Sequence, residues 1–223
     1  GDSEALEHYI ALAESLGMIG SAVAALEEKI QSGGVVTGRD YERLAYLASL
    51  ADDVQKYRQT LLAGVQRFPD DESLRLEAAY TFSDRGDFLE AAKLIREHPG
   101  LKTNPEVTRF YLSLLVQSQA FPEAEALLRS GLSAELLDQP AMLEIEAQIY
   151  EGTAQPAAAL IVYEKLLRSQ PDHLRLNMSY ARNLADVGRW KEAEAILSRL
   201  LRNPSADVLA LAAQVYAAAG KYR

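Results

Sequence analysis

The sequence predicts an all-α fold that is built by stacking similar pairs of helices. Three observations lead to this prediction: the composition, a turn motif that recurs along the chain, and a constant spacing of small residues. Ala, Leu, Glu and Arg recur most obviously and favour helix over strand, whereas the 223 residues include only 8 Pro and 13 Gly. Because 48% of the residues are hydrophobic, there are enough apolar side chains for a continuous core.

The turn motif joins two short segments of helical apolar periodicity. Between residues 172 and 204, the first segment ends at Gly188 and the second restarts at Lys191. Phe121 and Trp190 share one position just after the turn, and we interpret both as packing anchors. The motif therefore predicts two helices connected by a tight turn.

A small residue five positions after each turn marks the register of the repeat. These marks are Ala22, Ala91, Ala124, Ala159 and Ala193, with Tyr57 at the interpolated position of the second unit. The successive spacings are 35, 34, 33, 35 and 34 residues. Such a constant period indicates an array of one repeated helix-turn-helix unit, in which small residues let helix backbones approach closely.

The unit boundaries follow from this register and from Pro residues that end the second helix, with Asp, Asn or Ser nearby to cap the next helix. We predict one solenoid domain over residues 1–223, because repeats that touch only their neighbours create no internal domain boundary. The predicted units are 3–37, 38–71, 72–104, 105–139, 140–173, 174–205 and a partial unit 206–223. Since the last unit stops before its second helix, we expect a fragment of a longer array.

These residues resemble the tetratricopeptide repeat (TPR) family, whose unit has about 34 residues with small and aromatic residues at fixed positions. The fifth unit carries the pattern at Leu143, Glu146, Ala147, Tyr150, Ala159, Tyr163, Leu166 and Pro171. The resemblance implies a right-handed α-α superhelix of about six and a half helix-turn-helix repeats. The second unit departs most: Tyr57 replaces a small residue, Asp52 and Asp53 replace the turn glycine, and Gly64 could admit the bulk of Tyr57.

The sequence carries no pattern that is typical of a catalytic or metal site. It lacks a Gly-rich phosphate loop, a His-Glu-x-x-His pair and a Gly-x-Ser-x-Gly elbow. The three histidines, His8, His98 and His173, lie in three different units, and we interpret His98 and His173 as surface or capping residues. With no cysteine, disulfides and thiolate metal sites are excluded. We expect a non-enzymatic protein without catalytic residues, metal or cofactor.

In the TPR family, partners bind to a concave surface that the first helix of each unit lines. The resemblance therefore implies a partner-binding lining of mixed to acidic character. Its candidate residues are Glu4, Glu7, Glu14, Arg39, Glu42, Tyr46, Tyr80, Asp84, Arg109, Gln148, Arg175, Met178 and Arg182. The lining lacks the Lys and Asn with which chaperone-binding members clamp a C-terminal carboxylate, so that class of partner is disfavoured. The alternative is a lining that is merely solvated.

The net charge of −9 is concentrated toward the N-terminus. Residues 1–37 contain six acidic side chains and one lysine, which gives a local charge of −5, whereas residues 139–223 carry +1. An acidic surface repels phosphate backbones, so we expect no nucleic acid partner, and a basic protein face or a cationic polymer would be attracted. No apolar run approaches the roughly 20 residues that would span a membrane.

A narrower resemblance is to the periplasmic scaffolds of bacterial exopolysaccharide exporters, similar to the Pel polysaccharide outer-membrane export proteins. The Ala- and Leu-rich divergent units, the acidic surface and the boundary at residues 67–71 carry it. It implies a periplasmic protein-binding scaffold that recruits a polysaccharide-modifying enzyme such as a deacetylase, or guides a cationic polysaccharide, in export and biofilm formation. The alternative is a cytosolic TPR adaptor or regulator that binds a peptide in its concave groove.

Overall fold

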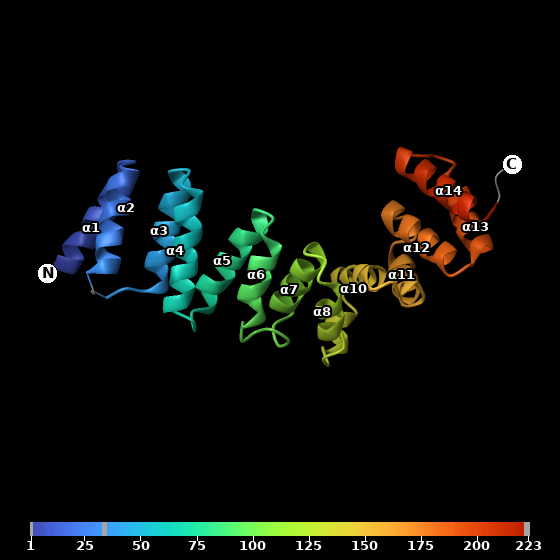
Figure 1. The fold of residues 1–223 in the computed structure, drawn as a ribbon, viewed down its shortest axis with the longest axis horizontal. Coiled ribbons are helices and arrows are strands. Elements are labelled where there is room, and N and C mark those ends of the chain that lie inside the picture. Colours follow the sequence, from blue (N-terminus) through green and yellow to red (C-terminus); the bar gives the residue numbers. More distant parts are fainter. Residues whose placement is uncertain (1, 33–34, 221–223) are drawn as a thin grey trace. The chain divides into compact units, whose positions relative to one another are not determined.

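The computed structural model describes residues 2–32 and 35–220, and within these ranges every regular element is a helix (Figure 1). The all-α fold class is therefore confirmed. The chain divides into two compact units, residues 1–101 and 102–223, which are described separately. A single solenoid domain over residues 1–223 remains a prediction from the repeat pattern.

The first compact unit contains three pairs of helices. Its helices are α1 (Asp2–Ser15), α2 (Ile19–Gln31), α3 (Gly38–Leu50), α4 (Val54–Arg67), α5 (Glu72–Asp84) and α6 (Phe88–Arg96). The strongest contacts join α1 with α2, α3 with α4 and α5 with α6; in addition, the first pair contacts the second and the second contacts the third. This is the arrangement that the first three predicted repeats require.

The second compact unit continues the pattern with one addition. Its helices are α7 (Pro105–Gln117), α8 (Phe121–Leu128), α9 (Ala134–Leu137), α10 (Pro140–Gly152), α11 (Pro156–Ser169), α12 (Leu174–Asp186), α13 (Trp190–Leu200) and α14 (Ala206–Ala218). The single-turn helix α9 was not expected. Ser133 caps this helix, because its hydroxyl accepts a hydrogen bond from the Leu136 N–H at 3.2 Å, and the helix lies in the loop that joins the fourth and fifth pairs.

The turn inside each helix pair is the same even where the sequence differs. One residue adopts a positive φ in each pair: Gly17, Asp52, Gly86, Gln119, Ala154 and Gly188. A backbone hydrogen bond then closes the turn, as from the Ala120 N–H to the Leu115 carbonyl at 2.8 Å. The left-handed conformation costs a non-glycine residue roughly 1–2 kcal/mol. The closing hydrogen bond and helix packing offset that cost at Asp52, Gln119 and Ala154.

The register marks confirm the predicted repeat. Ala22, Ala91, Ala124, Ala159 and Ala193 are all 0% exposed, and each lies on the second helix of its pair. Tyr57 is half-buried instead, and its hydroxyl donates to the Thr81 Oγ1 atom at 2.6 Å. The expectation that Gly64 accommodates Tyr57 is wrong, because a Cβ at Gly64 would lie 2.7 Å from the Cβ of Tyr41.

Other local expectations have mixed outcomes. Asp71 and His173 each cap the following helix, through hydrogen bonds from the Leu74 N–H at 3.0 Å and from the Leu176 N–H at 3.4 Å. His98 is not a surface residue: it is 4% exposed, and its Nδ1 atom accepts a hydrogen bond from the Gly100 N–H at 2.9 Å.

Across the described helices, none combines the length and the apolar character that a membrane span needs.

The buried face of α13 supports a test of the register. Ala193 packs in a cluster with Leu160, Leu184 and Leu197, so Ala193→Arg would force a charged side chain into a close helix contact. We expect a loss of roughly 2–4 kcal/mol in the free energy of unfolding from overpacking and desolvation. Thermal melting would measure this loss of stability. Ala195→Arg, on the exposed side of the same helix, is the matched control, and equal melting temperatures would contradict the register.

A second test uses the contact between the fourth and fifth helix pairs. A Cβ at Gly152 would lie 2.3 Å from the ring of Phe121, whereas a Cβ at Gly20 would meet no atom within 4 Å. We expect Gly152→Ala to destabilise by about 1–3 kcal/mol through overpacking. Gly20→Ala should be neutral or stabilise by up to about 1 kcal/mol, because Ala favours helix. Urea denaturation would show these opposite signs, and a stabilising Gly152→Ala would mean that Phe121 is not an anchor.

Candidate functional site

A groove with a volume of about 1000 Å³ opens on the first compact unit. Most of its lining comes from α1, α3 and α5, the first helix of each pair, and α2 adds two side chains. The lining residues are Glu7, Glu14, Ile19, Lys29, Thr37, Arg39, Asp40, Glu42, Arg43, Tyr46, Leu47, Leu50, Ser73 and Glu77. The groove therefore lies on the face of the helix pairs that the TPR resemblance implies for partner binding.

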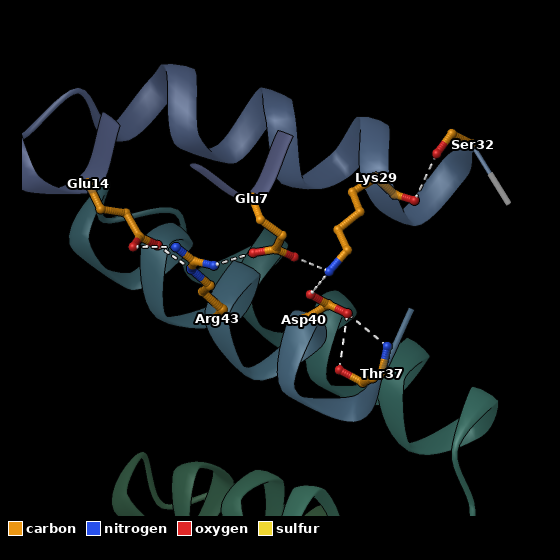
Figure 2. A network of polar contacts seen from close by, with 7 residues as sticks. All are labelled: Glu7, Glu14, Lys29, Ser32, Thr37, Asp40 and Arg43. Atoms are coloured by element: carbon orange, nitrogen blue, oxygen red, sulfur yellow. Dashed lines mark hydrogen bonds and ion pairs between the residues drawn. The ribbon is translucent and has the colours of Figure 1, made fainter. Parts of the chain in front are cut away.

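One wall of the groove is a chain of ion pairs that connects α1, α2 and α3 (Figure 2). Arg43 binds Glu14 through two hydrogen bonds, from Nε to Oε1 at 2.6 Å and from Nη2 to Oε2 at 2.7 Å. Arg43 also donates from Nη1 to Glu7 at 3.2 Å, and the other carboxylate oxygen of Glu7 pairs with Lys29. Two cations and the carboxylates of Glu7 and Glu14 are thus bound to one another.

The inner end of this chain is the ion pair between Lys29 and Asp40. The Nζ atom of Lys29 lies 2.6 Å from Oδ1 of Asp40, and the two residues are only 8% and 6% exposed. The second carboxylate oxygen of Asp40 accepts hydrogen bonds from the N–H and the hydroxyl of Thr37, at 2.7 and 3.1 Å. Asp40 therefore both caps the start of α3 and attaches it to α2.

The environment keeps both members of this pair charged. Burial disfavours the charged form of Asp40, but hydrogen bonds from Lys29 and Thr37 outweigh it and lower the pKa of Asp40. Burial likewise opposes the charge of Lys29, yet Asp40 and Glu7 raise its pKa. The stabilisation by Asp40 is lost only as the pH falls through its lowered pKa, and that by Lys29 only as the pH rises through its raised pKa. The pair therefore holds throughout the neutral range.

The remaining charges of the groove are arranged differently. Within the described residues, Glu42 and Glu77 make no hydrogen bond or ion pair with the protein, and neither does Arg39. Burial is the main cause that raises the pKa of Glu42, and the nearby carboxylates of Asp71 and Glu77 add to it, against the opposing charge of Arg39. Two carboxylates with one compensating arginine leave this part of the groove acidic.

The C-terminal half of α3 gives the groove an apolar end. Tyr46 and Leu50 are 60% and 52% exposed although both are large hydrophobic residues. Ile19, at the start of α2, lines the same groove, and the buried Leu47 contributes to its lining. An aromatic and an aliphatic side chain that are open to solvent in a groove favour contact with an apolar group of a partner.

The structure places the predicted lining residues in three sets. Five lie together in the groove: Glu7, Glu14, Arg39, Glu42 and Tyr46. Glu4, Tyr80 and Asp84 are exposed on the same compact unit but do not line it. The other five belong to the second compact unit, where Gln148, Arg175 and Arg182 are exposed, Arg109 pairs with Glu106, and Met178 packs against a core cluster. Partner binding by these residues remains a prediction.

Sequence reasoning missed four charged residues of the groove: Lys29, Asp40, Arg43 and Glu77. The prediction covered only fixed positions on the first helix of each unit, whereas Lys29 lies on a second helix. The spacing of Thr37 and Asp40 is a capping-box signal that could have located Asp40. Nothing local in the sequence indicates that Arg43 reaches Glu14, because this contact depends on how two helix pairs stack.

The lining of the groove offers both polar and apolar contacts to a ligand. Lys29 and Arg43 already have carboxylate partners, so neither is free to clamp an anionic group. Among the residues that the structure describes, no group of three or more His, Cys, Asp and Glu side chains is placed to hold a metal ion. The mixed lining therefore offers carboxylates, one arginine and an apolar end to a ligand.

The Lys29–Asp40 pair makes a direct prediction about stability. Lys29→Met would leave the buried carboxylate of Asp40 without its main partner, which costs about 3–5 kcal/mol. Lys56→Met is the matched control, because Lys56 and Glu27 form a half-exposed pair whose loss costs at most about 1 kcal/mol. Hydrogen exchange of the α2 and α3 amides and thermal melting would measure both variants. Equal protection in the two variants would show that the buried pair does not hold these helices together.

Comparison with known proteins supports the TPR resemblance. Residues 153–215, from the turn before α11 into α14, match the sequence model of the tetratricopeptide repeat family. A search of curated protein sequences gave no significant match.

Solved structures extend the likeness over nearly the whole chain. A tetratricopeptide repeat protein from Parabacteroides merdae matches with a TM-score of 0.57 at 14% identity, covering 98% of this chain and 87% of that protein. PilW, a widely conserved type IV pilus biogenesis factor, matches with a TM-score of 0.56 at 15% identity, covering 95% and 98%. At such identities the likeness concerns the fold. The chain thus has a TPR-like, all-α solenoid fold, and the TPR family is supported by the match over residues 153–215 and by these structural neighbours.

Proposed function

We propose that this chain is a non-catalytic scaffold that binds a partner protein in the groove on residues 1–101. TPR proteins are generally scaffolds for protein-protein interaction, and the chain has their fold. The observation that carries the proposal is the groove itself, which exposes the large apolar residues Tyr46 and Leu50 beside charges that lack partners among the described residues. Exposed apolar side chains in a polar groove are a feature of interaction sites.

Within this function we propose a role in periplasmic, Pel-like exopolysaccharide export and biofilm formation, in which the scaffold recruits a polysaccharide-modifying enzyme such as a deacetylase. The sequence resemblance supports this role: the Ala- and Leu-rich divergent repeats, the acidic N-terminal region and the boundary at residues 67–71. The acidic groove would also suit a partly deacetylated, cationic polymer. A cytosolic adaptor that binds a peptide is the competing assignment.

The test blocks the groove sterically in the full-length protein of its own host. Ser73→Trp introduces a large side chain at an exposed lining position of α5, and Gln59→Trp adds the same side chain on the exposed face of α4, away from the groove. We expect Ser73→Trp to weaken binding of the cognate deacetylase by at least about tenfold, or roughly 1.4 kcal/mol, and to lower exopolysaccharide secretion. Biolayer interferometry and a secretion assay would measure these effects.

The two assignments give different results in that experiment. A scaffold in polysaccharide export resides in the periplasmic fraction, binds the deacetylase, and loses both binding and secretion with Ser73→Trp but not with Gln59→Trp. A protein that is found in the cytosolic fraction and leaves secretion unchanged would contradict the export role and favour the adaptor. If neither variant affected any partner, the groove would not be the binding site.

A further inference from the structure

Charged and apolar side chains occupy different parts of the groove, and their arrangement indicates what kind of ligand the groove binds. Along α3 the residues that face the groove begin with Arg39 and Glu42 and end with Tyr46 and Leu50. Ser73 and Glu77 of α5 also line the groove, so Glu77 adds a second carboxylate to its acidic part. The groove thus has an acidic part at the N-terminal half of α3 and an apolar part at its C-terminal half.

The acidic part of the groove is selective for cations, because the two neighbouring cationic side chains of the protein are already bound in ion pairs. Lys29 and Arg43 are bound by Glu7, Glu14 and Asp40, so they offer no attraction to an anion. Glu42 and Glu77 have no bonded partner within the described residues, and the charges of Asp71 and Arg39 act on Glu42 from nearby. A cationic side chain placed here would relieve the mutual repulsion of the carboxylates.

The spacing of the two parts along α3 sets the spacing of complementary groups in a ligand. Glu42 and Tyr46 are four residues apart, which is about 6 Å along a helix axis, and Leu50 is about 12 Å from Glu42. In an extended chain, alternate side chains point to the same side at intervals of about 6.6 Å. A residue at one position and the residues two and four positions later would therefore face Glu42, Tyr46 and Leu50.

We propose that the groove binds an extended segment of a partner protein in which a Lys or Arg is followed, two and four residues later, by apolar side chains. This inference rests on the proposed protein-binding function and specifies the kind of partner. The basic side chain lies between Glu42 and Glu77, and the two apolar side chains contact Tyr46 and Leu50. The exposed apolar end favours a protein segment over a cationic polysaccharide, because a sugar chain carries charge but no aliphatic side chains to cover these residues.

Synthetic peptides of twelve residues test this pattern directly. The probe contains the core Lys-Thr-Leu-Thr-Leu. The comparison peptides replace Lys by Glu, replace both Leu by Thr, or move the first Leu next to Lys so that it points to the opposite side. A glucosamine hexamer tests the cationic sugar. Titration of each into the purified chain, followed by NMR or calorimetry, should give at least tenfold tighter binding for the probe than for any comparison ligand.

Variants with matched controls locate the contact on the chain. Glu42→Gln combined with Glu77→Gln should reduce the preference for the Lys peptide over the Glu peptide to less than twofold, whereas Glu28→Gln, on the exposed face of α2, should not change it. Tyr46→Ala should weaken binding about tenfold, and Tyr9→Ala, at another exposed tyrosine that lies outside the groove, should have no effect. Melting curves confirm that the variants fold, since all five residues are at least partly exposed.

Salt and pH provide independent readouts of the same carboxylates. At about 0.5 M salt, screening shrinks to a few ångströms, so the affinity for the Lys peptide should fall, whereas the contribution of its two Leu side chains should be little affected. Because the pKa of Glu42 is raised, its carboxylate takes up a proton earlier than an ordinary glutamate as the pH falls. A proton then competes with the basic side chain, and affinity should decrease with falling pH in the wild type but not in the Gln variants.

The outcomes separate this inference from the proposed function. Equal binding of the Lys and Glu peptides, tighter binding of the glucosamine hexamer, or no effect of the Glu42 and Tyr46 variants would overturn the basic and apolar pattern. If the cognate deacetylase still bound in a manner sensitive to Ser73→Trp, the scaffold function would stand without it. If the peptide pattern held but the deacetylase did not bind, the export role would fail and the inference would stand.

Discussion

The close approach of helix backbones at buried alanines is the constraint on which the rest of this structure depends. Ala91 in the first compact unit and Ala193 in the second are completely buried on the second helix of their pairs. At these positions a larger side chain would separate two helices that bury each other's apolar faces. The turn inside each pair is constrained as well, because one of its residues adopts a positive φ whether that residue is Gly188 or Ala154.

This packing explains why the first compact unit can hold charges away from water. Stacking the pair α1/α2 against α3 brings Lys29 and Asp40 together at 2.6 Å in a nearly buried position. Such a pair gains little net stability over apolar side chains, yet it specifies one arrangement, because any other leaves a buried charge unpaired. In the same wall, Arg43 joins Glu14 of α1 to α3. The stacking geometry of the groove is therefore fixed by charged side chains that are paired with one another and are not available to bind a ligand.

The sequence was sufficient to predict the repeat but not the site. The period of small residues predicted the helix pairs and the burial of Ala22 and Ala159, because these follow from contacts inside one unit. The single-turn helix at 134–137 was missed, since it depends on the conformation of one loop. The same limit applies to the groove: the positions of Glu42 and Tyr46 follow from helix periodicity, whereas the pairing of Glu14 with Arg43 requires two stacked units.

The distinction between paired and unpaired carboxylates changes how the acidic N-terminal region should be understood. Its charge of −5 over residues 1–37 includes Glu7 and Glu14, which the structure binds to Lys29 and Arg43. These two carboxylates therefore contribute less to the attraction of a partner than the sequence count indicates, and substituting them would loosen the stacking of α1 on α3 as well. Attraction of a cation depends instead on Glu42, whose burial and carboxylate neighbours oppose its charge until a basic group arrives.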